Sequence, residues 1–164
     1  WKLELDVRGD TVAISNASLN LDGLPFSGNG GYRPDYIDLY LTGDDLSLAH
    51  LLERLPKGTA DQYSRFDATG KLHFRAHIIG DPKKRPRIYA DFHLNNGTLK
   101  DPGTSQILEQ LEIEGRYDNA AGNLRNTLIE LSEFSGVAQN SSFAGSFSMT
   151  DLKTPLVIAK LNDR

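Results

Sequence analysis

The fold is decided by two stretches, Lys71-Leu-His-Phe-Arg-Ala-His-Ile78 and Arg87-Ile-Tyr-Ala-Asp-Phe-His-Leu94, in which apolar and polar residues alternate strictly. Successive side chains of a β-strand point to opposite faces of a sheet, so this period of two predicts strands with one apolar and one polar face. The residues on the apolar face are Leu72, Phe74, Ala76, Ile78, Ile88, Ala90, Phe92 and Leu94. Between the stretches, Gly80-Asp-Pro-Lys-Lys-Arg-Pro86 has the prolines and charges of a solvated loop. Together they predict a long β-hairpin.

One register of this hairpin keeps the two apolar faces together. Its cross-strand pairs include Arg75–Asp91, His73–His93, His77–Tyr89 and Phe74–Phe92. Opposite charges and aromatic pairs are favourable across an antiparallel ladder. A slip of one residue would turn the apolar side chains toward water. The sequence therefore predicts antiparallel pairing in this register.

The same alternation recurs along the chain, for example at Lys2–Arg8, Tyr36–Thr42 and Leu111–Tyr117. An apolar fraction of 38% and a mean hydropathy of −0.42 suit strands that bury one residue in two. Composition does not shift along the 164 residues, so a single β domain over 1–164 is expected. We predict a mainly β fold: a strongly curled antiparallel sheet, forming a groove or an open barrel, with one or two short helices.

The main predicted helix follows the strand that ends near Thr42. Its leucines recur at helical spacing, at Leu48, Leu51, Leu52 and Leu55, and Pro56 ends the pattern. Asp44 or Asp45 is the predicted N-cap, because a short carboxylate accepts hydrogen bonds from the first turn. Such a stripe usually packs on a core, and here the helix could also plug one end of a curled sheet.

Three further local predictions concern turns and irregular strands. Asn96-Gly97 is a strong signal for a tight turn. Thr104–Gln110 is compatible with one helical turn, and the glycines of Gly28-Asn-Gly-Gly31 indicate bulges or sharp coiling. Phe26-Ser-Gly28 and Phe143-Ala-Gly145 open two loosely similar stretches, which suggests a structural repeat.

Charge and composition exclude several classes of function. A formal net charge of −4 argues against a nucleic-acid surface. The chain has no cysteine, so neither disulfides nor thiolate metal sites are available. No apolar run approaches the roughly 20 residues that span a bilayer. Because the sequence starts at Trp1 without a leader pattern, we expect a segment of a longer chain.

The histidines are the main candidates for a metal site or a general base, and the serines and carboxylates form no catalytic pattern. His73, His77 and His93 share the polar face with Asp91, but His73 and His77 are about 13 Å apart along the strand. Only the His73–His93 pair could share an ion, and Arg75 competes for the Asp91 carboxylate. A solvated polar face is favoured, so we predict no enzyme activity, no cofactor and no metal site. A metal-dependent enzyme on the His73/His93 face is the less favoured alternative.

Several stretches resemble AsmA-like proteins. They include Ala17-Ser-Leu-Asn-Leu-Asp-Gly-Leu-Pro-Phe26, Asp45-Leu-Ser-Leu-Ala-His-Leu-Leu-Glu-Arg-Leu-Pro56, Gly70-Lys-Leu-His-Phe74, Pro86-Arg-Ile-Tyr-Ala-Asp-Phe92 and Phe143-Ala-Gly-Ser-Phe-Ser-Met-Thr-Asp-Leu152. AsmA-like proteins are envelope proteins of Gram-negative bacteria, usually with an inner-membrane helix and a long periplasmic body. The resemblance implies a curled sheet with an apolar groove, and a role in moving phospholipid between the two membranes. It carries over no catalytic residue.

The resemblance and the patterning together predict a periplasmic segment of the cell envelope that shields phospholipid acyl chains. The eight apolar residues of the opening hairpin are the predicted groove lining. No nucleic-acid partner is expected, and membrane contact would be made only by other parts of an inner-membrane-anchored full-length protein. The main alternative is a structural or adhesive β module with a closed core and no ligand.

Overall fold

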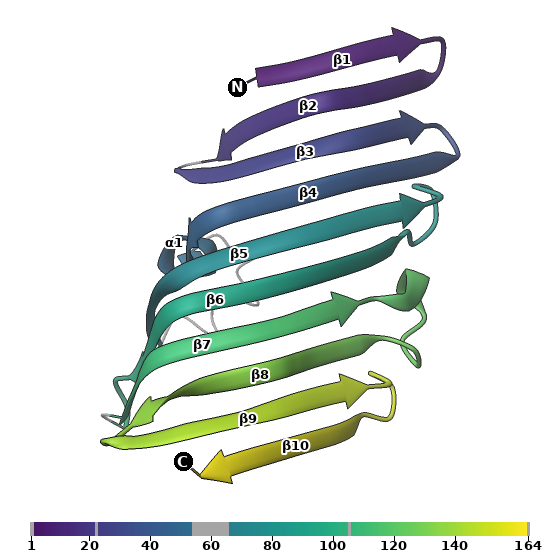
Figure 1. Cartoon of the computed structure of the whole chain (residues 1–164). Helices are drawn as coiled ribbons and strands as arrows, with labels where there is room; N and C mark the ends of the chain where they lie inside the picture. The colour runs from purple at the N-terminus through teal and green to yellow at the C-terminus, as the bar shows by residue number, and fades with distance from the viewer. Residues whose placement is uncertain (1, 22, 54–65, 105, 164) are drawn as a thin grey trace.

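A computed structural model describes residues 2–21, 23–53, 66–104 and 106–163. Ten strands form one antiparallel sheet in which every strand pairs with its neighbours in sequence, so the chain is an unbroken meander (Figure 1). The strands are β1 (Lys2–Arg8), β2 (Thr11–Leu21), β3 (Leu24–Arg33), β4 (Tyr36–Ser47), β5 (Asp67–Gly80), β6 (Arg87–Asp101), β7 (Gln106–Asp118), β8 (Leu128–Ala138), β9 (Ser141–Thr150) and β10 (Leu156–Asp163). The sheet is not closed, which confirms the predicted curled, mainly β architecture.

The predicted hairpin register is confirmed at the centre of the sheet. In the β5–β6 pair, Phe74 lies opposite Phe92, and His73 lies opposite His93. Arg75 and Asp91 are also partners, and the loop between the two strands begins after Gly80. Strict alternation was sufficient here because a shift by one residue would have exchanged the two faces.

The predicted helix is confirmed in part, as α1 (Leu48–Glu53), but its predicted N-cap is wrong. Asp44 and Asp45 belong to β4, where the ladder to β5 shifts register between Gly43 and Leu46. The side chain of Ser47 occupies the capping position instead, with its Oγ accepting a hydrogen bond from the backbone N–H of His50 at 3.5 Å. Leu55 and Pro56 lie outside the described residues. A second short helix, η1 (Ala120–Gly122), joins β7 to β8.

Two other local predictions are wrong. Asn96-Gly97 is not a turn but part of β6, where Asn96 has a φ of 51° and the pairing with β7 shifts register. The backbone N–H of Asn96 donates to the Glu112 carboxylate at 2.9 Å, so a neighbouring strand satisfies it and the strand continues through a bulge. Gln106–Gln110, predicted as part of a helical turn, is the start of β7. In both places pairing with adjacent strands overrides a local signal.

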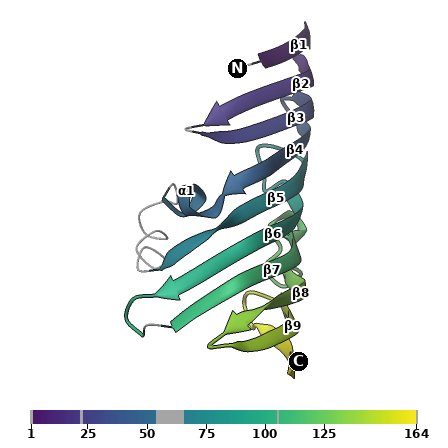
Figure 2. The same ribbon diagram turned by 60° about the vertical axis from the view of Figure 1, so that its left-hand side comes forward.

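The strand ends form two distinct sides of the sheet. On one side, which we call the helix end, α1 leaves β4 and contacts β4 and β5 (Figures 1 and 2). On the other side, which we call the turn end, short loops connect β1 to β2, β3 to β4, β5 to β6, β7 to β8 and β9 to β10. The first and last strands lie at opposite edges of the sheet, with the two chain ends (Figure 1).

Candidate apolar binding face

One face of the sheet is apolar across nearly its whole width. The strand registers align the side chains in rows that run from strand to strand. One row consists of Leu19, Phe26, Gly43, Phe74, Phe92, Gly115, Leu131, Phe147 and Ala159. The adjacent row toward the turn end consists of Ala17, Gly28, Leu41, Ala76, Ala90, Tyr117, Ile129, Met149 and Val157. We call this surface the apolar face.

The predicted lining residues lie together at the middle of the apolar face. They form four cross-strand pairs, Leu72–Leu94, Phe74–Phe92, Ala76–Ala90 and Ile78–Ile88. Leu94 is buried and the other seven are half-buried. The structure therefore places them on one contiguous surface. Their part in binding a ligand stays a prediction.

Glycines of the apolar face leave room for phenyl rings from the neighbouring strand. A Cβ added to Gly43 would lie 2.6 Å from the Phe74 ring, and one added to Gly115 would lie 2.6 Å from the Phe92 ring. A Cβ added to Gly145 would likewise lie 2.7 Å from the Phe134 ring. The rings thus lie over bare backbone, a pairing of aromatic and glycine that stabilises glycine-containing strands. In the alternation of apolar and polar residues a glycine reads as an interruption. These contacts could therefore not be predicted without knowing the strand register.

Burial along the apolar face is uneven. At the helix end Leu46 is 0% exposed and Leu94 is 6% exposed. At the edges of the sheet, Val7 is 61% exposed and Leu161 is 72% exposed. α1 is the single α-helix in the described part of the chain, and its main contacts with the strands are to β4 and β5. Among the described residues, no second layer covers most of the face.

The total exposed surface agrees with a single uncovered layer. The chain exposes 10978 Å². A compact monomer of 18.1 kDa would expose roughly 8,100 Å². A large apolar surface on a soluble domain marks an interaction site, because isolated monomers seldom expose more than a few hundred Å² in one patch.

The opposite face is polar and carries ion pairs between neighbouring strands. His77 Nε2 lies 2.8 Å from Asp38 Oδ1, and the His77 ring stacks on Tyr40 with centroids 4.1 Å apart. Arg116 pairs with Glu130. These contacts hold adjacent strands in register from the side opposite the apolar face. They are half-exposed, so each contributes modestly.

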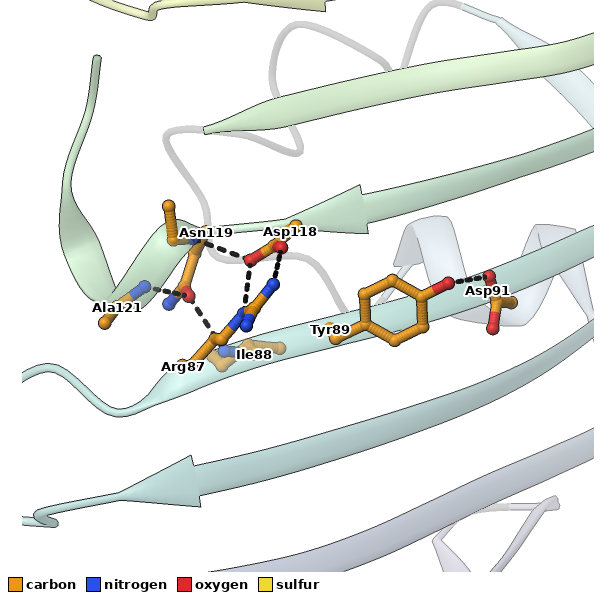
Figure 3. A network of polar contacts seen from close by, with 8 residues as sticks. Arg87, Ile88, Tyr89, Asp91, Asp118, Asn119 and Ala121 are labelled. Carbon is orange, nitrogen blue, oxygen red and sulfur yellow. Dashed lines mark hydrogen bonds and ion pairs between the residues drawn. The ribbon is translucent and has the colours of Figure 1, made fainter. Parts of the chain in front are cut away.

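The sequence predicted that Arg75 would bind the Asp91 carboxylate, but Asp91 has another partner. Although both residues are described, Arg75 and Asp91 form no ion pair, and Asp91 accepts a hydrogen bond from the Tyr89 hydroxyl at 2.8 Å (Figure 3). This bond raises the pKa of Tyr89. A shallow hollow of 740 Å³ lies over this part of the polar face, lined by side chains of both charge signs, among them Asp44, Arg75, Glu114 and Arg116.

The three histidines of the polar face do not assemble a metal site. His73 approaches Asp44 and Asp45 at 3.5 and 3.6 Å, and His93 approaches Glu112 at 3.6 Å. The two histidines are cross-strand partners, yet each faces its own carboxylate. Within the described ranges no group of three His, Cys, Asp or Glu side chains could hold a metal ion. In these ranges each of the three histidines lies near a carboxylate, without a third ligand to complete a metal site.

At the turn end an Asp–Asn pair holds the start of the β7–β8 connection against the start of β6. Arg87 Nε donates to Asp118 Oδ1 at 3.1 Å, and Arg87 Nη2 donates to Oδ2 (Figure 3). Asn119 Oδ1 accepts from the N–H groups of Ile88 and Ala121 at 2.8 and 3.0 Å. The hydrogen bond from Arg87, and after it the N–H of Ala120, lower the pKa of Asp118 against the opposing effect of burial. This network was not predicted from the sequence.

No protein-family model, curated protein or solved structure matches this chain. The resemblance to AsmA-like proteins therefore rests on the sequence stretches quoted above. In the part of the chain that the structure describes, no helix has the length and apolar character needed to cross a membrane.

Proposed function

We propose that this sheet shields lipid acyl chains on its apolar face. In this proposal the chain is a periplasmic segment of an AsmA-like envelope protein and contributes to phospholipid transport or outer-membrane biogenesis, without enzyme activity. The observation that carries the proposal is the apolar face itself. Its aligned rows cross nine strands, and the described residues cover it with protein only near α1.

The dimensions of the face suit a long, flexible ligand. Strands lie about 4.8 Å apart, so ten strands make a surface roughly 43 Å across. The row through Ala76 and Ala90 is bordered by larger side chains, including Phe74 and Phe92 on one side and Ile78 and Ile88 on the other. The two alanines therefore leave a low spot between taller residues at the centre of the face, with Leu41 and Tyr117 next to it in the same row.

The chemistry of the face favours acyl chains over polar ligands. The backbone groups beneath it are engaged in the strand ladders, and the aligned rows contain no charged side chain. Transfer of each methylene from water to such a surface contributes about 0.8 kcal/mol. The binding energy would therefore grow with chain length and depend little on the headgroup.

Lipid binding can be tested directly with the purified chain. The protein is produced in bacteria, isolated without detergent and examined by native mass spectrometry with lipid extraction. A fluorescent phospholipid offered in vesicles of phosphatidylethanolamine and phosphatidylglycerol provides a second assay. We expect co-purified phospholipid and transfer of the fluorescent lipid from the vesicles to the protein.

Two matched pairs of substitutions locate the binding surface. Phe74→Asp puts a charge on the apolar face, whereas Arg75→Asp puts one on the polar face of the same strand at an exposed position. Ala90→Lys and Asp91→Lys form the second pair on β6. We expect only the apolar-face variants to lose lipid, with circular dichroism confirming that all four are folded. Equal lipid uptake by both members of each pair would place lipid binding away from the apolar face, and no uptake by the parent chain would favour a structural module without a ligand.

A further inference from the structure

A second hollow lies on the polar face at the turn end, over β2, β3 and β4. Its volume is about 360 Å³, within the roughly 300 to 1,000 Å³ of small-molecule sites. Its lining side chains include Asn29, Arg33, Tyr36, Asp38 and Tyr40. We call it the tyrosine hollow. Each of the three strands beneath it is paired on both sides, so the hollow does not depend on an edge of the sheet.

The floor of the tyrosine hollow is bare backbone. The β3–β4 register places three cross-strand pairs in sequence here: Arg33–Tyr36, Gly31–Asp38 and Asn29–Tyr40. Gly31 contributes no side chain, and a Cβ added to it would meet only the Val12 carbonyl oxygen, at 3.7 Å. The two outer pairs are four residues apart, which is about 14 Å along a strand. A gap therefore lies over Gly31, between two tyrosine rings.

Tyr40 presents one face of its ring to this gap. The other face is covered, because the His77 ring of β5 stacks on it with centroids 4.1 Å apart and planes 9° apart. β5 and β3 lie on opposite sides of β4, so the uncovered face of Tyr40 is directed toward β3 and Gly31. Although it is stacked, Tyr40 is 49% exposed. A ring that is held from behind and open in front is a platform on which a ligand can stack.

Hydrogen-bonding groups lie beside this platform. Asp38 Oδ1 is 2.8 Å from His77 Nε2, a contact that orients the carboxylate. Within the described residues no side chain binds Asp38 Oδ2, so this oxygen is left for a ligand. Across the gap the Asn29 amide is exposed, and it can both donate and accept. The hollow thus combines one apolar surface with a few polar atoms, as ligand sites do.

The charges around the hollow favour a neutral ligand. The Arg33 guanidinium carbon lies 5.2 Å from the centre of the Tyr36 ring, so this ring already binds a cation. A cationic ligand would be repelled by Arg33, and an anionic ligand by Asp38 and by the net charge of −4. A purely apolar ligand would remove water from Asp38 without replacing its hydrogen bonds.

From this arrangement we infer that the tyrosine hollow binds a neutral saccharide through one pyranose ring. The C–H groups on one face of a pyranose are apolar and stack on Tyr40. The hydroxyl groups at the rim of the sugar donate to Asp38 Oδ2 and exchange hydrogen bonds with the Asn29 amide. The inference is independent of the lipid proposal, because the hollow lies on the face of the sheet opposite the apolar face.

The test is saturation-transfer NMR on the purified chain with the methyl glycosides of glucose, mannose, galactose and N-acetylglucosamine, each at up to about 50 mM. We expect at least one glycoside to bind with a Kd on the order of 1 mM, because a shallow hollow covers only part of the sugar. Saturation should be strongest at the C–H protons of one face of the ring.

Two variants locate the binding in the tyrosine hollow. Tyr40→Ala removes the platform and should weaken binding at least about tenfold. Gly31→Leu leaves the other lining residues unchanged but fills the gap, so it should abolish binding. Tyr89→Ala is the matched control, because Tyr89 lies on the same polar face but lines the 740 Å³ hollow, and it should bind like the parent chain. Circular dichroism confirms that all three variants are folded.

Each alternative has a distinct result. A parent chain that binds none of the four glycosides overturns the inference. Glycoside binding that is retained in Tyr40→Ala and Gly31→Leu but lost in Tyr89→Ala overturns it in favour of the larger hollow. Binding of phosphoethanolamine, offered as a separate probe, in place of every glycoside overturns it in favour of a charged headgroup.

Discussion

The helix end and the turn end of this sheet are stabilised by different forces. At the helix end the stabilising term is burial: Leu46 and Leu94 are almost fully withdrawn from water beside the α1 region. At the turn end the connections depend on hydrogen bonds from Asp and Asn side chains to backbone groups, as at Asp118 and Asn119. Between the two ends the apolar face is half-buried. A single-layer sheet can thus be stabilised at its two ends while the middle of its apolar face stays accessible.

The largest expected effect is at the helix end. Leu46→Ala removes a fully buried side chain and should lower the free energy of unfolding by about 2–5 kcal/mol. Leu5→Ala, the same change at a residue that is 49% exposed, should cost less than about 1 kcal/mol. Urea denaturation followed by circular dichroism measures both. Equal losses would mean that burial is not concentrated at the helix end.

The next effect concerns the glycines beneath the phenyl rings. In Gly115→Ala the new Cβ would lie 2.5 Å from the Glu130 carbonyl oxygen and 2.6 Å from the Phe92 ring. We expect a loss of about 1–3 kcal/mol, because backbone and ring must both move. Gly31→Ala is the control, since the only atom near its new Cβ is the Val12 carbonyl oxygen at 3.7 Å. A neutral Gly115→Ala would show that the ring does not lie over the glycine.

At the turn end, Asn119→Ala should cost about 1–2 kcal/mol, because it leaves the N–H groups of Ile88 and Ala121 without their side-chain acceptor. Its Nδ2 also donates to the Pro86 carbonyl at 3.0 Å, and this bond would be lost as well. Asn126→Ala, at an exposed position in the same connection, should be neutral. Thermal unfolding of the two variants provides the comparison, and similar melting temperatures would contradict it.

The smallest effect is a dependence on pH. Because the folded state lowers the pKa of Asp118, the stability that this carboxylate contributes is complete above the ordinary value of about 4. It is lost as the pH falls through the lowered folded-state pKa. The pKa values of Asp81 and Asp151, at two other turns, are lowered by hydrogen bonds too. We expect unfolding free energy to fall with acid below about pH 4, and less steeply in Asp118→Asn than in the parent chain. An identical slope in the variant would exclude a role for Asp118.

The sequence predicted the centre of the sheet well and its irregular positions poorly. Alternation indicated the β5–β6 register because a shift by one residue would have exposed Phe74 and Phe92. The errors at Asp44–Asp45 and Asn96-Gly97 share a cause. Both are places where a turn or cap signal lies within a strand and a bulge absorbs it, through Asp45 with a φ of 55° and Asn96 with a φ of 51°.

From the sequence, the candidate site could be predicted only as the apolar faces of individual strands. The eight lining residues of the central hairpin could be assigned to one surface from their spacing. That Gly43 and Gly115 continue the row of Phe74 and Phe92 required the β4–β5 and β6–β7 registers, both of which are shifted by bulges. Local patterns identify which side of a strand is apolar. They do not identify the cross-strand partners where a bulge shifts the register between two strands.

The neighbour-to-neighbour order of the strands has a consequence for how the chain folds and changes in length. Every strand contacts the strands directly before and after it, so each hairpin can form from residues close in sequence and growth can proceed from either side. Adding or deleting one hairpin would preserve strand direction at both edges and alter only the width of the apolar face. Such a chain is a linear array of hairpins, and the number of hairpins would determine how much ligand its apolar face can hold.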